Sequence, residues 1–199
     1  MLLKVQLVAD LSLREALRSL LDRETDLVIV RETADGDAHT VRPDLVVVDG
    51  DLEGGGALAI VRARKAERPR LPSLVLSGQP TQQLVLAALT AGASGVVAKV
   101  QPRRELVGAI RVVGSGGCYL CPELITIGAS ADAVRSRLTE RELAVYERLL
   151  LGRTHHTIAD ELQMSAHSVA AVRARVLRKL QLRNDTDLLC FAVRNGSTA

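Results

Sequence analysis

The chain has 199 residues, of which 47% are hydrophobic, and a formal net charge of +3. This composition supports one large or two small folded domains and excludes disorder as the main state. Three cysteines are an odd number, and Lys4 interrupts the first apolar run, so we expect neither a disulfide framework nor a membrane span and assign the chain to the cytoplasm.

Over the first 115 residues, apolar runs of strand length alternate with segments of helical period. The runs are rich in Val and Leu and nearly continuous, which is typical of parallel strands buried on both faces. The pattern predicts a doubly wound α/β domain over residues 1–115, with a parallel five-stranded sheet in the order 2-1-3-4-5. The interval 33–42 has room for only about one or two helical turns. The expected strands are 3–9, 27–30, 45–48, 73–76 and 95–98, and the expected helices are 12–24, 57–68, 81–91 and 103–113.

The rest of the chain has a different pattern. Residues 116–137 are enriched in Gly, Ser, Pro and Ala and are expected to form a linker. Residues 138–199 then have the pattern of a small all-α domain with four helices. Its expected helix signals are a capping box of Thr139 and Glu142, N-caps at Thr154 and Ser165, and a helix end at Gly152.

Polar residues follow or end several predicted strands of the first domain. The carboxyl ends of parallel strands meet at one edge, and with the order 2-1-3-4-5 Asp10 and Asp49 converge where the strand order reverses. Two carboxylates and a backbone carbonyl suit Mg²⁺, and the candidate metal set is Asp10, Asp49 and Asp51. Ser77 and Lys99 add a hydroxyl and an ammonium group to the same edge. An aspartate nucleophile beside such groups is typical of a phosphoryl-accepting site.

The third helix of the C-terminal domain carries a local charge. Residues 165–183 contain five Lys or Arg residues and no Asp or Glu, which suits a confined anionic partner. At 100° per residue, one side of the helix is apolar and would pack into the small core; it consists of Val169, Val172, Val176 and Leu180. The other side would enter the major groove of double-stranded DNA. The candidate DNA-binding residues are Ser168, Ala170, Ala171, Ala174, Arg175, Arg178, Lys179 and Arg183.

Alanine forms much of this face, and it cannot donate a hydrogen bond to a guanine edge. Direct base readout is therefore expected to be thin. Arg175 and Arg178 could reach bases or phosphates, whereas Lys179, Arg183 and Arg153 are expected to hold phosphates. Arg173 falls near the apolar side of the helix, where a charged group is unexpected.

Several motifs together resemble a known family over nearly the whole chain. PDLVVVD, VLSG and LAALTAGASGVVAK resemble the receiver domain of bacterial response regulators, and the last third resembles the LuxR-type helix-turn-helix. The combination is similar to the NarL/FixJ family. By position, the resemblance implies that Asp49 is the phosphoacceptor, Asp10 the surviving metal-site acid, Ser77 the switch hydroxyl and Lys99 the phosphate-contacting lysine. It also implies a sensor histidine kinase as a partner, and Mg²⁺ as a weakly bound cofactor.

The chain departs from the family pattern at the same site. Ala9 precedes Asp10 where the family has two adjacent acids, so the affinity for Mg²⁺ is expected to be reduced. Glu53 replaces the usual proline, Asp51 adds a negative charge, and Val96 replaces the aromatic switch residue. Two further interpretations therefore stay open: an ion-pair network in a receiver that no longer takes phosphate, and a receiver used only for oligomerisation.

The last segment is amphipathic. In LuxR-type domains the last helix pairs two protomers, so the resemblance implies that the chain binds DNA as a dimer. The expected dimer contacts are Leu188, Leu189, Phe191 and Ala192.

These observations predict a DNA-binding transcription regulator controlled by an atypical receiver, and not an enzyme. A second hypothesis is a protein-interaction partner that heterodimerises with a related regulator and reads DNA poorly alone. A remote third one is a phosphatase of the haloacid-dehalogenase type, because VVVDGDLEG resembles its D-x-D motif. That enzyme also needs a downstream acidic pair, and none follows Lys99.

Overall fold

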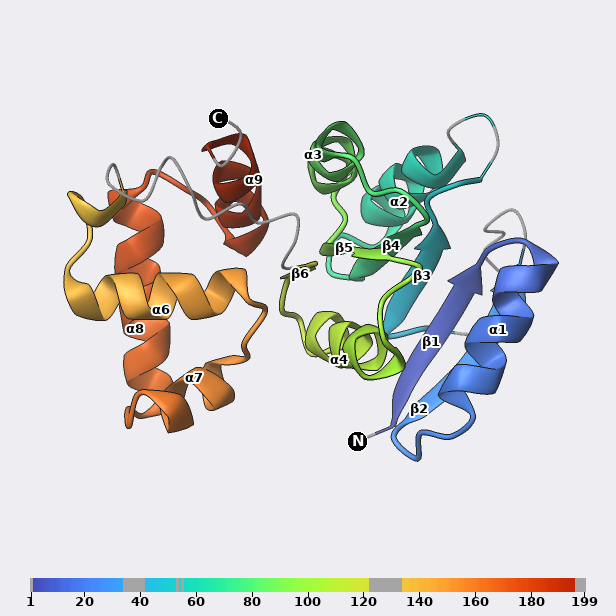
Figure 1. Ribbon diagram of the computed structural model, residues 1–199, viewed down its shortest axis with the longest axis horizontal. Coiled ribbons are helices and arrows are strands. Elements are labelled where there is room, and N and C mark those ends of the chain that lie inside the picture. Colours follow the sequence, from blue (N-terminus) through green and yellow to red (C-terminus); the bar gives the residue numbers. More distant parts are fainter. Residues whose placement is uncertain (1, 34–41, 53, 55, 122–133, 196–199) are drawn as a thin grey trace. The chain divides into compact units, whose positions relative to one another are not determined.

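The computed structural model describes residues 2–33, 42–52, 54, 56–121 and 134–195. The chain folds into two compact units, Met1–Gly116 and Gly117–Ala199 (Figure 1). The predicted short connection at 33–42, the departure at Glu53 and most of the predicted linker lie outside the described residues. None of the helices in the described ranges is long and apolar enough to cross a membrane.

The sheet has six strands in the order β2-β1-β3-β4-β5-β6. Its first five strands are parallel and follow the predicted order. The two-residue edge strand β6 (Tyr119–Leu120) was not predicted. Every residue of β3, β4 and β5 is buried, because helices cover both faces of the sheet. The strands are β1 (Leu3–Val8), β2 (Leu27–Thr33), β3 (Leu45–Asp49), β4 (Ser73–Ser77) and β5 (Gly95–Ala98).

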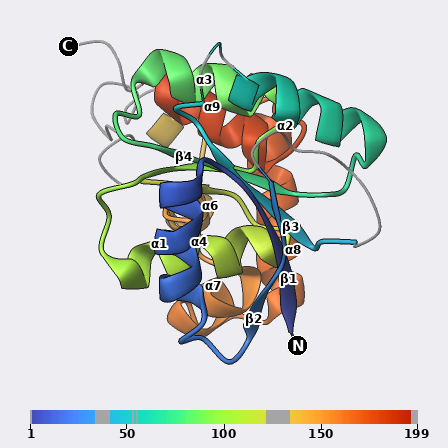
Figure 2. The ribbon, with the colours of Figure 1, turned by 90° about the vertical axis from the view of Figure 1, so that its right-hand side faces the viewer.

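Helices α2 and α3 lie on one face of this sheet and α1 and α4 on the other (Figure 2). Asp10 begins α1 by accepting a hydrogen bond from the backbone N–H of Leu13, and Thr81 begins α3 in the same way. Gly92, at φ +105°, ends α3 in the left-handed conformation that glycine tolerates best. The helices are α1 (Leu11–Leu21), α2 (Gly56–Glu67), α3 (Gln82–Ala91) and α4 (Arg103–Gly114).

The second unit is helical apart from a two-residue strand. The predicted capping box of Thr139 and Glu142 is present, and Thr154 and Ser165 cap the next two helices through their side-chain oxygens. Gly152 has φ +67°, which favours glycine, and a Cβ atom there would lie 2.9 Å from Cδ2 of the Tyr119 ring, so that ring would have to shift. The elements are β6 (Tyr119–Leu120), α6 (Glu140–Leu150), α7 (His155–Glu161), α8 (Ala166–Lys179) and α9 (Asp185–Asn195).

Candidate functional site

The acid, hydroxyl and ammonium groups predicted for the first unit do meet at the carboxyl edge of the sheet. Asp49 ends β3 and is 3% exposed. Lys99 follows β5, and its Nζ lies 2.6 Å from Asp49 Oδ1 and 3.0 Å from Asp51 Oδ2. The ammonium group is therefore shared between two carboxylates.

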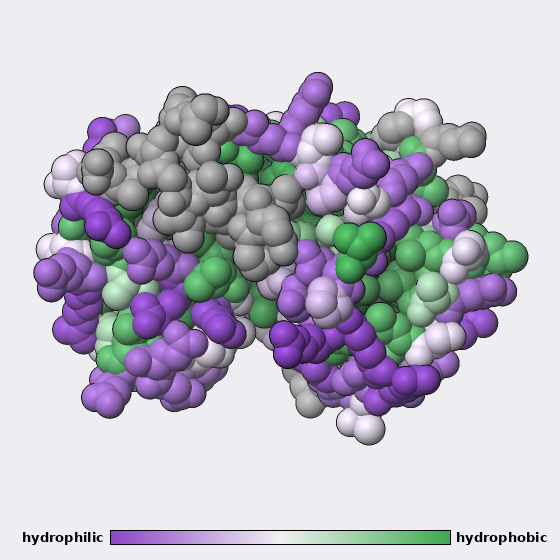
Figure 3. All heavy atoms as spheres, in the orientation of Figure 1, coloured by the Kyte–Doolittle hydropathy of each residue, from purple (hydrophilic) through white to green (hydrophobic). Residues whose placement is uncertain are grey.

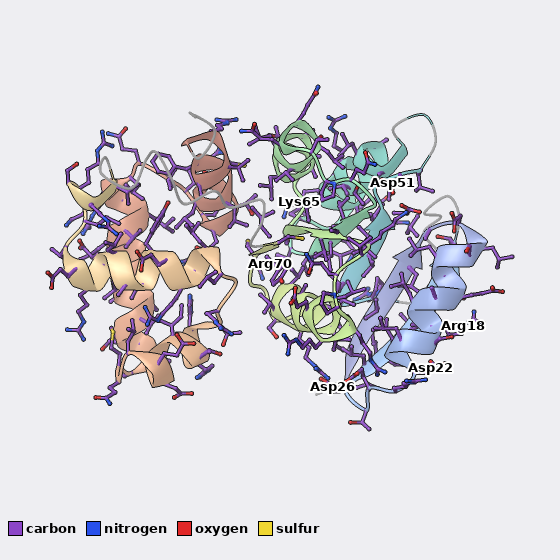
Figure 4. All side chains as sticks on the ribbon, in the orientation of Figure 1. Arg18, Asp22, Asp26, Asp51, Lys65 and Arg70 are labelled. Carbon is purple, nitrogen blue, oxygen red and sulfur yellow. The ribbon has the colours of Figure 1, made fainter. Side chains whose placement is uncertain are left out.

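Asp51 holds a central position that was expected only of a metal ligand. Its Oδ1 accepts a hydrogen bond from the Ser77 hydroxyl at 2.8 Å, and its Oδ2 accepts one from the backbone N–H of Gly78, also at 2.8 Å. Its own N–H donates to Asp49 Oδ1 at 2.9 Å. Asp51, labelled in Figure 4, thus joins the ends of β3, β4 and β5. In the sequence, this role could have been inferred only from the position of Asp51, two residues past the end of a buried strand.

Gly50 explains how the loop reaches across to β4. Its N–H donates to the Leu76 carbonyl at 2.6 Å. A Cβ atom at Gly50 would lie 2.8 Å from that same carbonyl oxygen and 2.9 Å from Val75 Cγ1. Because neither neighbour can move easily, only glycine allows β3 and β4 to approach so closely at this point.

The ion pairs and hydrogen bonds of this cluster favour the charged forms of Asp51 and Lys99. Burial raises the pKa of Asp51, but hydrogen bonds from Gly78, Lys99 and Ser77 outweigh burial and hold that pKa below its usual range. Burial likewise lowers the pKa of Lys99, and its hydrogen bonds to Asp49 and Asp51 outweigh that effect, so the pKa is raised. Asp51 and Lys99 are therefore both ionised at neutral pH.

The predicted metal set of Asp10, Asp49 and Asp51 is not assembled in the structure, which corrects that expectation. Asp10 is exposed, and its Oδ1 accepts from the Leu13 N–H at 2.8 Å as the cap of α1. Asp49 and Asp51 are paired with Lys99. Within the described ranges, no three His, Cys, Asp or Glu side chains gather in a way that could hold a metal ion. The three carboxylates of the predicted set are therefore not gathered around one point in the described structure.

Val96 occupies the interior of β5 and has no exposed surface. A short β-branched side chain in a strand has few alternative rotamers. The receiver thus lacks a ring that could swing between a buried and an exposed position.

In the second unit, the predicted two-sided character of α8 is confirmed. Val169, Val172, Val176 and Leu180 are buried, at 4% exposure or less. The opposite side is exposed along Ala170, Ala171, Ala174, Arg175, Arg178 and Lys179. Ser168 is half-buried at the start of the helix, where its N–H donates to the Ser165 hydroxyl. The part of this unit's surface visible in Figure 3 is mostly hydrophilic.

Two of the basic residues on this side share one buried acid. Glu142 is 4% exposed, and its Oε2 lies 2.6 Å from Lys179 Nζ while its Oε1 lies 3.6 Å from Arg175 Nε. The hydrogen bond from Lys179 is the main cause of a lowered Glu142 pKa. The capping motif pointed to Glu142, but its contact with α8 depends on tertiary packing and was missed.

The remaining basic residues of this region differ in their ion-pair partners and in their exposure. Arg173 Nε lies 2.7 Å from Asp185 Oδ1, which explains a charged residue near the apolar side of α8. Arg183 pairs with Asp187 at 2.8 Å but remains 86% exposed. Arg153 lies 3.5 Å from Glu161. Arg178 is exposed and makes no salt bridge with another described residue.

The predicted dimer strip is largely buried within the single chain. Leu188 and Leu189 have no exposed surface, and Ala192 is 6% exposed, so the single chain already covers them. An amphipathic helix buries its apolar stripe first against its own core, and a second protomer could reach these leucines only by unpacking them. Phe191 is partly exposed.

Comparisons with known proteins agree with this architecture. The family model of the response regulator receiver domain matches residues 8–111, and that of the bacterial regulatory proteins of the luxR family matches residues 136–192. The transcriptional regulatory protein UhpA of Salmonella typhimurium is 32% identical over 194 residues, which cover 94% of this chain and 96% of UhpA. The glycerol metabolism activator of Pseudomonas putida is 29% identical over 197 residues, which cover 90% of this chain and 89% of that protein.

Two solved structures of response regulators share this fold. The response regulator ChrA of a heme-sensing two-component system is similar with a TM-score of 0.53 and 29% identity, over 97% of this chain and 96% of that one. RcsB of Salmonella typhimurium shares the fold with a TM-score of 0.55 and 20% identity, over 96% of this chain and 97% of that one.

A receiver sheet followed by a LuxR-type helix-turn-helix defines a class of transcription regulators that bind DNA and are not enzymes. The chain belongs to this family, the LuxR-type response regulators of the NarL/FixJ kind. The phosphatase hypothesis finds no support, and the heterodimer hypothesis is not favoured.

Proposed function

We propose that the chain binds double-stranded DNA as a homodimer, with α8 of each protomer in the major groove, and that its receiver controls this binding. The observation that carries the proposal is the exposed side of α8, which combines basic residues with small ones and has no acidic residue between 165 and 183. Small side chains allow a helix to approach the groove closely, and cations at its end suit the phosphate backbone.

Support for the homodimer comes from the shared fold. RcsB, at 18% identity and a TM-score of 0.55, has been solved as two dimers bound to two parallel DNAs. On this chain, the partly exposed Phe191 of α9 is the remaining candidate for a dimer contact. Two copies of the helix-turn-helix would then face two half-sites about one helical turn apart.

The cations of α8 are expected to contribute unequally. Arg178 is free to reach a phosphate or a base edge, whereas Lys179 and Arg175 would first have to leave Glu142. The exposed pair of Arg183 and Asp187 costs little to exchange for a phosphate, because ion pairs at the surface are weak. Ala170, Ala171 and Ala174 offer only apolar contact with thymine methyl groups.

Control is proposed to run through the edge of the receiver where Asp49, Ser77 and Lys99 meet. Taken alone, the family resemblance would make Asp49 the phosphoacceptor of a sensor kinase, with Mg²⁺ as cofactor. The geometry supports the acid, hydroxyl and ammonium parts of that proposal, but it leaves Asp10 outside the cluster.

The test uses the full chain. Selection from random double-stranded DNA, followed by fluorescence anisotropy and light scattering, is expected to yield a sequence bound below micromolar concentration by two protomers. A monomer on DNA, or no preferred sequence in the absence of a second regulator, would contradict the proposal.

A further inference from the structure

The edge of the receiver offers three hydrogen-bond donors of the kind that a phosphoryl group needs. Ser77 provides a hydroxyl, Gly78 a backbone N–H and Lys99 an ammonium group. Phosphoryl oxygens are strong acceptors, and donors of this kind hold them through short, charge-assisted bonds. If Asp49 carried a phosphoryl group, these donors would be its natural partners.

In the structure, all three donors already serve one acceptor. Ser77 Oγ lies 2.8 Å from Asp51 Oδ1, the Gly78 N lies 2.8 Å from Asp51 Oδ2, and Lys99 Nζ lies 3.0 Å from that same oxygen. A carboxylate has two oxygens with the charge and acceptor strength to replace two phosphoryl oxygens. We propose that the Asp51 carboxylate is a built-in substitute for the phosphoryl group, which occupies its donors and keeps Asp49 from accepting phosphate.

Two glycines help to hold the Asp51 carboxylate permanently at these donors. Gly50 lets the backbone of the loop press against β4, so Asp51 is held opposite Ser77 by backbone contacts and not by its side chain alone. Gly78 places no side chain against the carboxylate; a Cβ atom there would lie 3.2 Å from Asp51 Oδ2. An acceptor on the same chain acts at a high effective concentration, so an incoming phosphoryl group competes poorly.

The proposal concerns only the receiver and does not depend on how the chain binds DNA. It is tested by incubating the full chain with phosphoramidate in a buffer that contains Mg²⁺, followed by intact mass spectrometry. In this reaction an Asp49 oxygen forms the new P–O bond while the P–N bond breaks, and ammonia leaves. We compare the natural chain with Asp51→Ala and with Asp51→Asn, which keeps the volume and removes the charge.

The natural chain is expected to gain almost no phosphoryl adduct. Asp51→Ala and Asp51→Asn are expected to gain at least about tenfold more, because the intramolecular competitor is gone. The adduct must be absent from the double variant Asp49→Asn/Asp51→Ala. Glu15→Ala, which removes an exposed acid from α1 and leaves the cluster intact, should behave like the natural chain.

Equal labelling of the natural chain and the Asp51 variants would overturn the proposal. So would the absence of labelling in both variants, provided that their circular dichroism spectra match that of the natural chain and that they unfold cooperatively in urea. Neither result would bear on DNA binding, which is measured separately.

Discussion

Each unit of this regulator has a charged cluster in which one acid holds two or more donors, but the two clusters leave different groups free. In the receiver, Asp51 accepts from the Ser77 hydroxyl and the Gly78 amide and shares the Lys99 ammonium group with Asp49, so all three donors already have an acceptor. In the DNA-binding unit, Glu142 takes Lys179 and Arg175 but leaves Arg178 exposed. An anion can therefore approach the second cluster directly, whereas in the first it must displace a carboxylate.

The largest effect is expected where the receiver cluster is most tightly packed. Gly50→Ala would place a Cβ atom 2.8 Å from the Leu76 carbonyl oxygen. Overpacking of this kind lowers the free energy of unfolding by about 1–3 kcal/mol. Urea unfolding followed by circular dichroism measures the change. Gly108→Ala is the control, because a Cβ atom there meets nothing within 4 Å and alanine favours the helix. Equal free energies of unfolding for both variants would show that the loop after β3 can shift to accommodate the added methyl group.

The next effect concerns the exposed cation of α8. Arg178→Ala should weaken DNA binding about tenfold and reduce the salt slope by about one unit per lost phosphate contact. Stability should not change, since the side chain has no described partner. Anisotropy titrations at several salt concentrations give both quantities. An unchanged salt slope would show that Arg178 does not contact DNA. The proposed difference between the two clusters would then be wrong.

Lys179→Ala should affect folding stability more than DNA binding. It leaves the buried Glu142 without its closest cation, and we expect the free energy of unfolding to fall by about 1 kcal/mol, a small value because Lys179 is half exposed. The change in salt slope should be smaller than for Arg178→Ala. If Lys179→Ala instead lowers the slope as much and leaves unfolding unchanged, then Lys179 serves DNA and not Glu142.

The smallest effect is a dependence on pH. Both Asp51 and Glu142 have lowered pKa values in the folded chain, so each contributes stability above its unfolded pKa of about 4 and loses it as the pH falls through the folded value. Between pH 6 and pH 3, the free energy of unfolding should therefore fall less in Asp51→Asn and in Glu142→Gln than in the natural chain. Unfolding curves at these two pH values test the sign. A steeper loss in either variant would contradict it.

Periodicity predicted the fold closely, because strands buried on both faces and capped amphipathic helices leave strong local patterns. The strands at Leu45–Asp49 and Gly95–Ala98 differ from the expected ranges by one residue or none. The choice of partners was harder to predict. Asp10 could have been recognised as a helix cap from its place just before α1, but a choice between cap and metal ligand depends on where its side chain turns.

Other contacts could not be predicted at all from local pattern. The apolar strip of α9 does not reveal whether Leu188 and Leu189 face their own core or a second protomer. The partners of Arg173 and Lys179 lie 12 and 37 residues away and become visible only when the helices pack. Long-range polar pairs leave no periodic signal in the sequence.

The Arg173–Asp185 pair has a geometric consequence. Asp185 is the first residue of α9, so the pair fastens the start of this helix to the middle of α8. The ion pair is a direct contact between these two helices. If α9 joins two protomers, this contact is one of those through which the dimer helix of each protomer is connected to its DNA-binding helix.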